Sequence, residues 1–487
     1  MPDVHLLTFL ALLKDIGAPL TRPSQLNFVI LAVGWLQSTG IHAVTEALVV
    51  ADVAGKRHHE AFHRFFSRGT WNPDHLGFWL FRRLERWLEE DGVVRVVIDD
   101  TLASKKGPQV FGIGSHLDAV RSTRRRRVFA FGHCWVVLSV VLRVPFSARA
   151  WSLPILFRLY RNKKECAKNA GSYRKKTELA REMLDTLLNW TARRVEVATD
   201  SAYCNDTVMR GLPDRLFLFG SMRPDAVLTE LPNPSVVSRG RPRKRGTPVP
   251  KPEVIAKDDS IPWQQCRVFV YRREATIRYK TFCAQWYRAC GVRLLRIVIV
   301  ATDGGAVPFR VFFSTDAALD VPTIIARYGA RWSIEVFFRE AKQLLGFGDS
   351  QARKKEAVLR VAPFVGLLYS VLVLWFLEGA SGSPFATPPV RPWYPHKRGF
   401  SFQDILRAAR RAGAGPDPHG PRGDPAAGGS RAGRVAGAGR ADPGLGGVIP
   451  PASTTGSDTC DAQMHHAHPI DCRYSKPAIG SQSPNDM

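Results

Sequence analysis

Four polar residues share one face of a predicted helix: Tyr328, Arg331, Glu335 and Lys342. On a helical wheel they fall within about 60° of one another. The opposite side is apolar, as expected of a helix that docks on a core. Carboxylates hold hard cations such as Mg²⁺, and neighbouring Arg and Lys side chains bind phosphates. The alternative is a solvated helix face carrying ordinary ion pairs.

The sequence also predicts where this helix begins and ends. Asp320 is a suitable N-cap, and Pro322 is suited to the first turn. Gly346 is a suitable stop. One continuous helix is therefore predicted between these positions. Glu340 lies off the polar face, so Glu335 is the preferred functional carboxylate.

The spacing Tyr-x2-Arg-x3-Glu-x6-Lys resembles the signature of the cut-and-paste DDE transposases of bacterial insertion sequences. The resemblance implies an enzyme with a ribonuclease H-like catalytic core that cuts and joins DNA. It also implies two aspartates at strand ends, which complete the acidic set with Glu335.

Two aspartates directly follow predicted strands. The strand Val93–Ile98 leads into Asp99 and Asp100, and a shorter strand leads into Asp200. Successive strand side chains point to opposite faces, so Asp99 and Asp100 are not equivalent. The family pattern, an acidic residue followed by Asp-Thr, selects Asp100 as the ligand. The opposite assignment, with Asp99 as the ligand, remains open.

The resemblance implies that Asp100, Asp200 and Glu335 are catalytic and hold Mg²⁺, with Mn²⁺ as the alternative. Two ions about 3.5–4 Å apart activate a nucleophile, neutralise the phosphate and stabilise the leaving oxygen. Tyr328, Arg331 and Lys342 would contact the phosphates of the bound DNA end.

The composition supports a polyanionic partner. Lys and Arg number 69 against 43 Asp and Glu, a formal charge of +26. Double-stranded DNA is the default, specifically terminal inverted repeats and target DNA, and an anionic membrane surface is the competitor. Eight cysteines do not form a disulfide framework in a chain of 487 residues, and no secretory signal is recognised. A cytoplasmic protein at the bacterial nucleoid is expected.

The predicted fold class is α/β, a ribonuclease H-like core with a β-rich insertion, preceded by an all-helical N-terminal domain. Its predicted parts are a helical DNA-binding domain (1–92), the first part of the core (93–220), the β-rich insertion with a basic loop (221–320), the second part of the core with the glutamate helix (321–378), and a C-terminal helix with a disordered or frameshifted tail (379–487). Arg239 and Arg241, in the basic loop, are predicted DNA contacts.

The apolar run Val361–Leu377 is borderline in length for a membrane span. It contains Pro363, Gly366 and Ser370. A buried core helix is the preferred interpretation, and no membrane partner is expected.

Two other functions compete with a transposase. A noncatalytic DNA-binding protein derived from a transposase would keep the fold and the charge. A zinc metalloprotease would use His59, Glu60 and His63, which match the pattern H-E-x-x-H in cationic surroundings. No phosphate-loop pattern is found, so a nucleotide cofactor is not expected. A homodimer on DNA is expected, because two transposon ends must be processed together.

Overall fold

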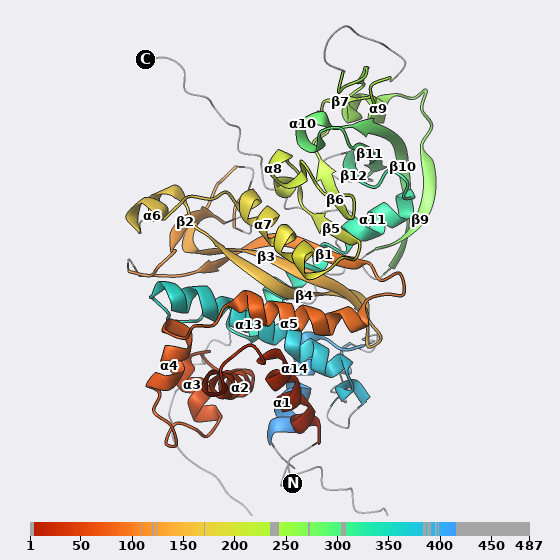
Figure 1. The fold of residues 1–487 in the computed structure, drawn as a ribbon. Coiled ribbons are helices and arrows are strands. Elements are labelled where there is room, and N and C mark those ends of the chain that lie inside the picture. The colour runs from red at the N-terminus through yellow and green to blue at the C-terminus, as the bar shows by residue number, and fades with distance from the viewer. Residues whose placement is uncertain are drawn as a thin grey trace, which may run out of the picture.

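The computed structural model describes residues 4–414 except 108, 119–120, 124, 170, 234–242, 271–272, 303–307, 383–385, 387–390, 395–396 and 398. Within these residues the chain has the predicted α/β fold, a long mixed sheet with helices on both faces (Figure 1). The predicted contacts Arg239 and Arg241 lie outside the described residues, and so does the predicted tail from residue 415 onward.

The N-terminal part is helical, as predicted. Its helices are α1 (Val4–Ile16), α2 (Arg22–Gln37), α3 (Val44–Val50), α4 (Glu60–Ser67) and α5 (Pro73–Leu84), followed by the short 3₁₀ turn η1 (Glu85–Trp87). Local sequence explains why α5 begins where it does. The Asn72 side chain accepts a hydrogen bond from the Asp74 N–H at 2.9 Å, and Pro73 occupies the first turn.

Five strands form the core of the sheet: β1 (Val94–Ser104), β3 (Phe129–Val144), β4 (Ser147–Tyr160), β5 (Val195–Thr199) and β6 (Leu216–Met222). Their order in space is β4-β3-β1-β5-β6. β3 is antiparallel to β1 and β4, whereas β5 is parallel to both β1 and β6. This is the strand order of a ribonuclease H-like core, so the predicted fold class is confirmed. β2 (Gly114–Leu117) pairs with the beginning of β3.

The predicted β-rich insertion continues the same sheet. Its strands are β7 (Leu228–Thr229), β8 (Pro248–Val249), β9 (Gln264–Val270), β10 (Arg273–Gln285), β11 (Leu294–Ala301) and β12 (Phe309–Ser314), with α9 (Pro252–Lys257) and α10 (Tyr287–Cys290) between them. β12 pairs antiparallel with β6, and β11 and β10 follow in order. The insertion is therefore joined to the core by main-chain hydrogen bonds.

The remaining helices cover the two faces of the core: α6 (Lys163–Lys168), α7 (Lys176–Trp190), α8 (Asp206–Met209), α11 (Val321–Gly329), α12 (Trp332–Leu344), α13 (Lys355–Leu377) and α14 (Phe402–Ala414). Figure 1 shows α7 on one face of the sheet and α13 on the other. α12 contacts β1, β4 and α13, so it lies on the α13 face.

The predicted helix from residue 321 to residue 345 is interrupted, so its continuity was predicted wrongly. The Asp320 cap is as expected and accepts from the Thr323 N–H at 3.0 Å, but α11 ends at Gly329 and α12 begins at Trp332. α11 packs on β9, whereas α12 packs on β4 and β1. The chain turns at Ala330 and Arg331 because the two segments dock on different parts of the sheet.

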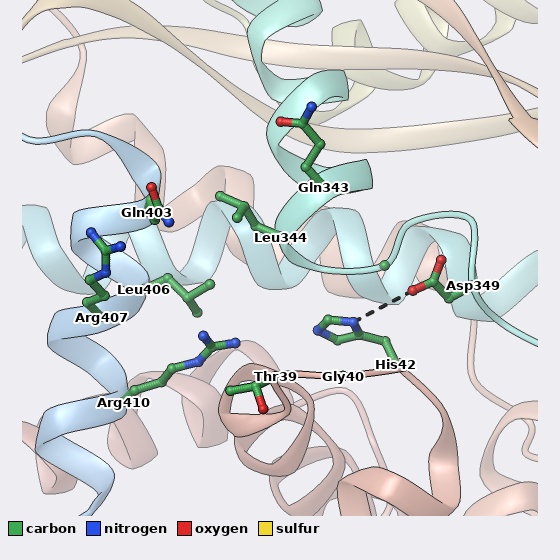
Figure 2. Close-up of a pocket in the computed structure, with 11 residues that line it drawn as sticks. Thr39, Gly40, His42, Gln343, Leu344, Asp349, Gln403, Leu406, Arg407 and Arg410 are labelled. Carbon is green, nitrogen blue, oxygen red and sulfur yellow. Dashed lines mark ion pairs between the residues drawn. The ribbon is translucent and has the colours of Figure 1, made fainter. Parts of the chain in front are cut away.

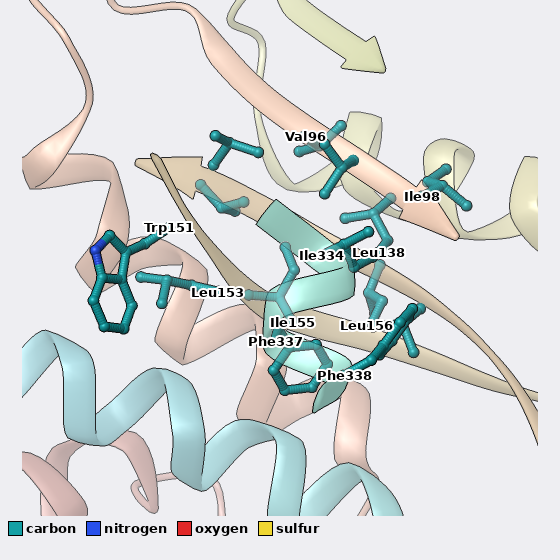
Figure 3. Packing of buried hydrophobic residues seen from close by; sticks show 14 of the residues in the cluster. Val96, Ile98, Leu138, Trp151, Leu153, Ile155, Leu156, Ile334, Phe337 and Phe338 are labelled. Carbon is teal, nitrogen blue, oxygen red and sulfur yellow. The ribbon is translucent and has the colours of Figure 1, made fainter. Parts of the chain in front are cut away.

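Apolar packing fixes α12 against the core. Ile334 and Phe337 are fully buried, and Figure 3 shows them beside aliphatic side chains of β4, including Leu153 and Ile155. Burying side chains of this size stabilises the fold by about 1.5–3 kcal/mol each. The buried side of α12 therefore fixes the direction of its polar side.

α13 contains the apolar run Val361–Leu377, for which a buried core helix was predicted and a membrane span was the alternative. It is the one helix of the described residues that is long and apolar enough to cross a membrane, and 89% of its most apolar window is buried inside the protein. Phe28 and Phe66 of the N-terminal helices pack edge-on against its Phe364. α13 thus forms the contact layer between the sheet and the N-terminal helices.

Two buried histidines beside the core sheet predict a pH-dependent stability. Burial lowers the pKa of both His116 and His133 from 6.5 to about 4. The unfolded chain therefore binds more protons than the folded chain between about pH 4 and 6.5. The stability that comes from keeping these rings neutral is complete above pH 6.5 and is lost as the pH falls toward 4.

We expect His133→Gln to flatten the dependence of melting temperature on pH in this range. Glutamine does not titrate, and its amide N–H can replace the hydrogen bond that joins His133 Nε2 to the Phe111 carbonyl at 2.8 Å. Thermal unfolding of both proteins from pH 4.5 to 7.5 measures the effect. An unchanged slope in the variant would contradict this account.

Candidate active site

β1 continues through Asp99 and Asp100 to Ser104, so these aspartates lie in the middle of the strand and not directly after it as predicted. They point to opposite sides of the strand, as alternation along β1 requires. The Asp99 Oδ2 accepts from Arg331 Nη1 at 3.1 Å. Its Oδ1 accepts from the Asp100 N–H at 2.8 Å. Asp99 is thus the member of the pair that contacts Arg331, in the turn before the glutamate helix.

Asp200 lies beside Asp99. It directly follows β5, which is parallel to β1 with Ile98 opposite Thr199, so the next residue of each strand shares the same level and face. The Asp200 Oδ1 accepts from the Ala202 N–H at 3.0 Å and caps the 3₁₀ turn η2 (Ser201–Tyr203). This capping bond orients the carboxylate at the end of the strand.

Arg331 connects the acidic residues. It lies in the turn between α11 and α12, only 6% exposed, and donates from Nη2 to Glu335 Oε1 at 3.0 Å while Nη1 contacts Asp99. Burial alone would lower the pKa of the guanidinium, but Asp99, Tyr328, Glu335 and Asp200 together hold that pKa well above its ordinary value. A permanently charged arginine therefore lies among three carboxylates.

Asp100 has different partners, on the α7 face. Its Oδ2 lies 2.7 Å from Lys176 Nζ, and its Oδ1 accepts from the Tyr203 hydroxyl at 2.9 Å. Burial, followed by the charge of Asp100, raises the pKa of Tyr203 well above its usual range, so this hydroxyl remains a donor. Arg331 thus joins Asp99 to Glu335, whereas Asp100 is contacted by Lys176 and Tyr203. The charge of Asp100 also reaches Lys342 of α12, so Asp100 is not remote from the glutamate helix.

Lys176 and Tyr203 were not singled out from the sequence. Tyr203 occurs three residues after Asp200, and Lys176 ends a basic run and is the first residue of α7. These positions alone do not indicate that both contact the same carboxylate, because that contact needs the folded sheet.

The other predicted contacts differ in exposure. Lys342 has an exposed side chain on α12. Burial lowers the pKa of its ammonium, and the nearby charges of Asp118 and Asp100 oppose that shift. Tyr328 is half-buried, with its ring 4.7 Å from that of Phe312 and 5.9 Å from the Arg331 guanidinium. Arg331 itself is buried against carboxylates, whereas the sequence placed it on phosphates.

Glu340 belongs to the core. Its two carboxylate oxygens lie 3.0 and 3.1 Å from Arg149 Nη2, and Oε2 accepts from the Tyr369 hydroxyl at 2.7 Å. Its side chain is only 9% exposed. This buried network joins β4, α12 and α13, so Glu340 has a structural partner on each side.

A family model described as a DDE superfamily endonuclease matches residues 18–287, which is more than half of the chain. The chain belongs to the DDE superfamily endonucleases. The matched residues include Asp99, Asp100 and Asp200 and end before Glu335.

No curated protein matches this chain. Among solved structures, a piggyBac transposase in a synaptic complex with hairpin DNA is similar over 84% of this chain and 80% of its own, at 11% sequence identity and a TM-score of 0.38.

The side chains of Asp99, Asp200 and Glu335 have the donor type that a hard divalent cation prefers. All three donors are carboxylates, the ligands that Mg²⁺ and Mn²⁺ favour. In the described part of the chain, however, no three His, Cys, Asp or Glu side chains lie close enough to hold a metal ion. Arg331 lies among the carboxylates and provides the positive charge that a cation would bring. We infer that metal binding requires Arg331 to release at least one of them.

The residues of the zinc-protease pattern, His59, Glu60 and His63, lie at the start of α4. His59 precedes α4, and its ring lies 5.9 Å from that of His63. Glu60, the residue that would act as the base, is paired with Arg64 at 2.7 Å.

The position of Arg331 predicts a competition between arginine and metal. In Arg331→Gln the nearly buried Asp99 loses its guanidinium, which we expect to cost up to about 3–5 kcal/mol of folding free energy. A divalent cation would replace that charge. Mg²⁺ should therefore raise the melting temperature of the variant more than that of the wild type, measured against EDTA.

Arg327→Gln is the matched control, because Arg327 pairs with a different carboxylate, Glu196, at 3.0 Å. This variant should respond to Mg²⁺ like the wild type. An equal Mg²⁺ response in all three proteins would contradict the competition.

The buried network around Glu340 predicts a purely structural variant. Glu340→Gln leaves Arg149 without its buried anion and should lower the free energy of unfolding by about 1–3 kcal/mol. Urea denaturation measures the loss. Arg149→Gln should cost a similar amount, and the double variant should cost less than the two single changes together. Additive losses would show that the two side chains act independently.

Proposed function

We propose that this DDE endonuclease is a DNA transposase. It binds the terminal inverted repeats of an insertion sequence, cleaves at the ends and joins the exposed 3′-hydroxyls to target DNA. The observation that carries the proposal is the grouping of Asp99, Asp200 and Glu335 around Arg331 beside the central strands of a ribonuclease H-like sheet. Its support is threefold: the family, the Tyr-Arg-Glu-Lys spacing, and a formal charge of +26.

The geometry favours Asp99 as the strand ligand. The resemblance to transposases selects Asp100 from the pattern Asp-Asp-Thr, but the Asp100 carboxylate is engaged by Lys176 and Tyr203. Asp99 is joined to Glu335 through Arg331, and it follows Ile98, the residue opposite Thr199 in the neighbouring strand. We therefore assign Asp99, Asp200 and Glu335 as metal ligands and Asp100 as a positioning residue.

Asp100 positions the site through Tyr203. The Tyr203 hydroxyl donates to Asp100, and Tyr203 ends the short turn that Asp200 caps. Lys176 neutralises the same carboxylate and ties the start of α7 to β1. A shift of Asp100 would thus move the turn that orients Asp200.

The three carboxylates would hold Mg²⁺ or Mn²⁺, and two such ions, when bound, supply charge neutralisation at the phosphate and activation of the attacking oxygen. Arg331 limits how far Asp99 and Glu335 separate, because its rigid fork contacts both. Lys342 is exposed on the same helix as Glu335 and is placed to contact a phosphate of the bound strand.

DNA has a second basic surface available before the start of β3, about 30 Å along the strand from the residues opposite the aspartates. Arg125, Arg126 and Arg127 are all exposed where the chain enters β3, the strand next to β1. Phosphate contacts of this kind supply most of nonspecific binding. A homodimer on DNA is part of the proposal, because both ends of the element must be processed together.

Cleavage of a labelled transposon-end duplex in Mg²⁺ tests the assignment. Asp99→Asn and Glu335→Gln should each reduce cleavage more than about 100-fold, whereas Asp100→Asn should reduce it about 10- to 100-fold, as loss of a supporting contact does. Glu340→Gln is the matched control and should retain cleavage below its melting temperature. All variants should still bind the duplex.

Three outcomes would count against parts of this proposal. Retained cleavage by Glu335→Gln would overturn the acidic set. A larger loss in Asp100→Asn than in Asp99→Asn would return the ligand role to Asp100. Duplex binding without cleavage by the wild type would favour a noncatalytic DNA-binding protein derived from a transposase.

A further inference from the structure

A cavity of about 250 Å³ lies at the far end of the glutamate helix (Figure 2). Three segments distant in the sequence form its wall: the turn between α2 and α3, the end of α12 with the loop that follows it, and α14. Most of the lining side chains are polar: Thr39, His42, Gln343, Asp349, Gln403, Arg407 and Arg410. The site lies away from the acidic set, since eight helical residues, about 12 Å, separate Gln343 from Glu335.

His42 presents an unsatisfied nitrogen at this cavity. Its side chain is only 6% exposed, and Nδ1 lies 3.8 Å from Asp349 Oδ2. Nε2 is buried and has no hydrogen-bond partner among the described residues. Figure 2 shows the ring edge away from Asp349 turned toward the cavity. Leaving a buried nitrogen without a partner destabilises the fold, so a ligand that bonds to it offsets that loss.

Two arginines give the cavity an excess of positive charge. Arg410 is held in place by the end of α2, since it donates to the carbonyls of Leu36 at 2.8 Å and Ser38 at 2.5 Å. Burial, and then the neighbouring charge of Arg407, lowers the pKa of Arg410. Asp349 is the one acid in the lining. The balance therefore favours an anion.

Arg407 is the more available of the two. Its nearest acid, Asp404, lies at 3.6 Å and already pairs with Arg391 and Lys397. Arg407 and Arg410 are three residues apart on α14, which places them on the same side of the helix. Guanidinium groups bind oxyanions through paired N–H donors.

We propose that this cavity binds a phosphate group, through Arg407, Arg410 and the doubly protonated His42. Protonated His42 donates from Nε2 to the anion and from Nδ1 toward Asp349. The phosphate comes either from the DNA backbone or from a small phosphorylated molecule. In both cases the bound group would tie the end of the glutamate helix to α2 and α14.

Binding is tested on the full chain with inorganic phosphate, with chloride at the same ionic strength as the reference. Phosphate should raise the melting temperature of the wild type, and calorimetry should give an affinity at least tenfold weaker in Arg407→Gln and in His42→Gln. Arg411→Gln is the matched control, because Arg411 is exposed, lies next on α14 and is outside the lining. It should bind phosphate like the wild type.

A second measurement isolates His42 from the titration of phosphate itself. Sulfate keeps its charge from pH 6 to 8, so its pH dependence reports on the protein. Burial lowers the pKa of His42, with Asp349 and Arg410 the charged groups that face it. Sulfate should therefore bind more tightly as the pH falls from 8 to 6, and His42→Gln should abolish this dependence.

Two further ligands distinguish the sources. If the phosphate belongs to DNA, Arg407→Gln should weaken duplex binding and reduce its salt slope by about one unit. If it belongs to a small molecule, deoxyadenosine monophosphate should bind more tightly than inorganic phosphate, with duplex affinity unchanged in the variant. These measurements do not involve cleavage, so they remain informative if the transposase proposal fails.

The proposal is overturned if phosphate and chloride have the same effect on the wild type. It is also overturned if Arg407→Gln, His42→Gln and Arg411→Gln all bind phosphate equally, since the ion would then be held elsewhere.

Discussion

The buried guanidinium of Arg331 is the interaction on which the site depends. It contacts Asp99 on the central strand and Glu335 on α12, and its high pKa also reflects Asp200. These acids come from three segments that are far apart in the chain, and three neighbouring carboxylates would repel one another without a cation. Arg331 removes that repulsion, and the interruption between α11 and α12 places it where it contacts both sides.

The pair Asp99 and Asp100 shows how one strand serves two sets of contacts. Asp99 contacts Arg331, whereas Asp100 is bonded to Tyr203 and Lys176. Because Tyr203 is part of the turn capped by Asp200, the contacts of Asp100 support the geometry of the acidic residues. A substitution of either aspartate would therefore affect activity, and only the size and nature of the effect distinguish a ligand from a support.

The sequence predicted what local patterns encode. Three patterns could be read locally: an apolar strand that contains an aspartate, an Asp-x-Pro sequence at the start of a helix, and the order strand–strand–strand–helix–strand. The fold class was predicted from these patterns. The broken helix was missed, because the break comes from docking on two different parts of the sheet. Arg331 was placed correctly beside Glu335, but its burial against Asp99 depends on a strand more than two hundred residues away.

The choice between Asp99 and Asp100 was beyond the sequence for a similar reason. Alternation along a strand says that the two differ, but it does not say which face the glutamate helix covers. The apolar side of α12, where Ile334 and Phe337 dock on the core, fixes the helix, and Arg331 then contacts both Glu335 and Asp99. Glu340, on the same helix, is turned by the same docking into the network with Arg149 and Tyr369.

The long insertion between Asp200 and Glu335 does not disturb the site, and the sheet explains why. The chain leaves the core after β6 and returns as β12, which pairs directly with β6, with Ser314 opposite Phe219. The return point is therefore fixed by main-chain hydrogen bonds beside the departure point, whatever the length of chain between them. Since α11 and α12 follow β12 at once, Arg331 and Glu335 are delivered to the same part of the sheet as Asp200. The insertion can accordingly vary in length and sequence without changing the positions of the carboxylates, provided that the pairing of β12 with β6 and the docking of α11 on β9 are kept.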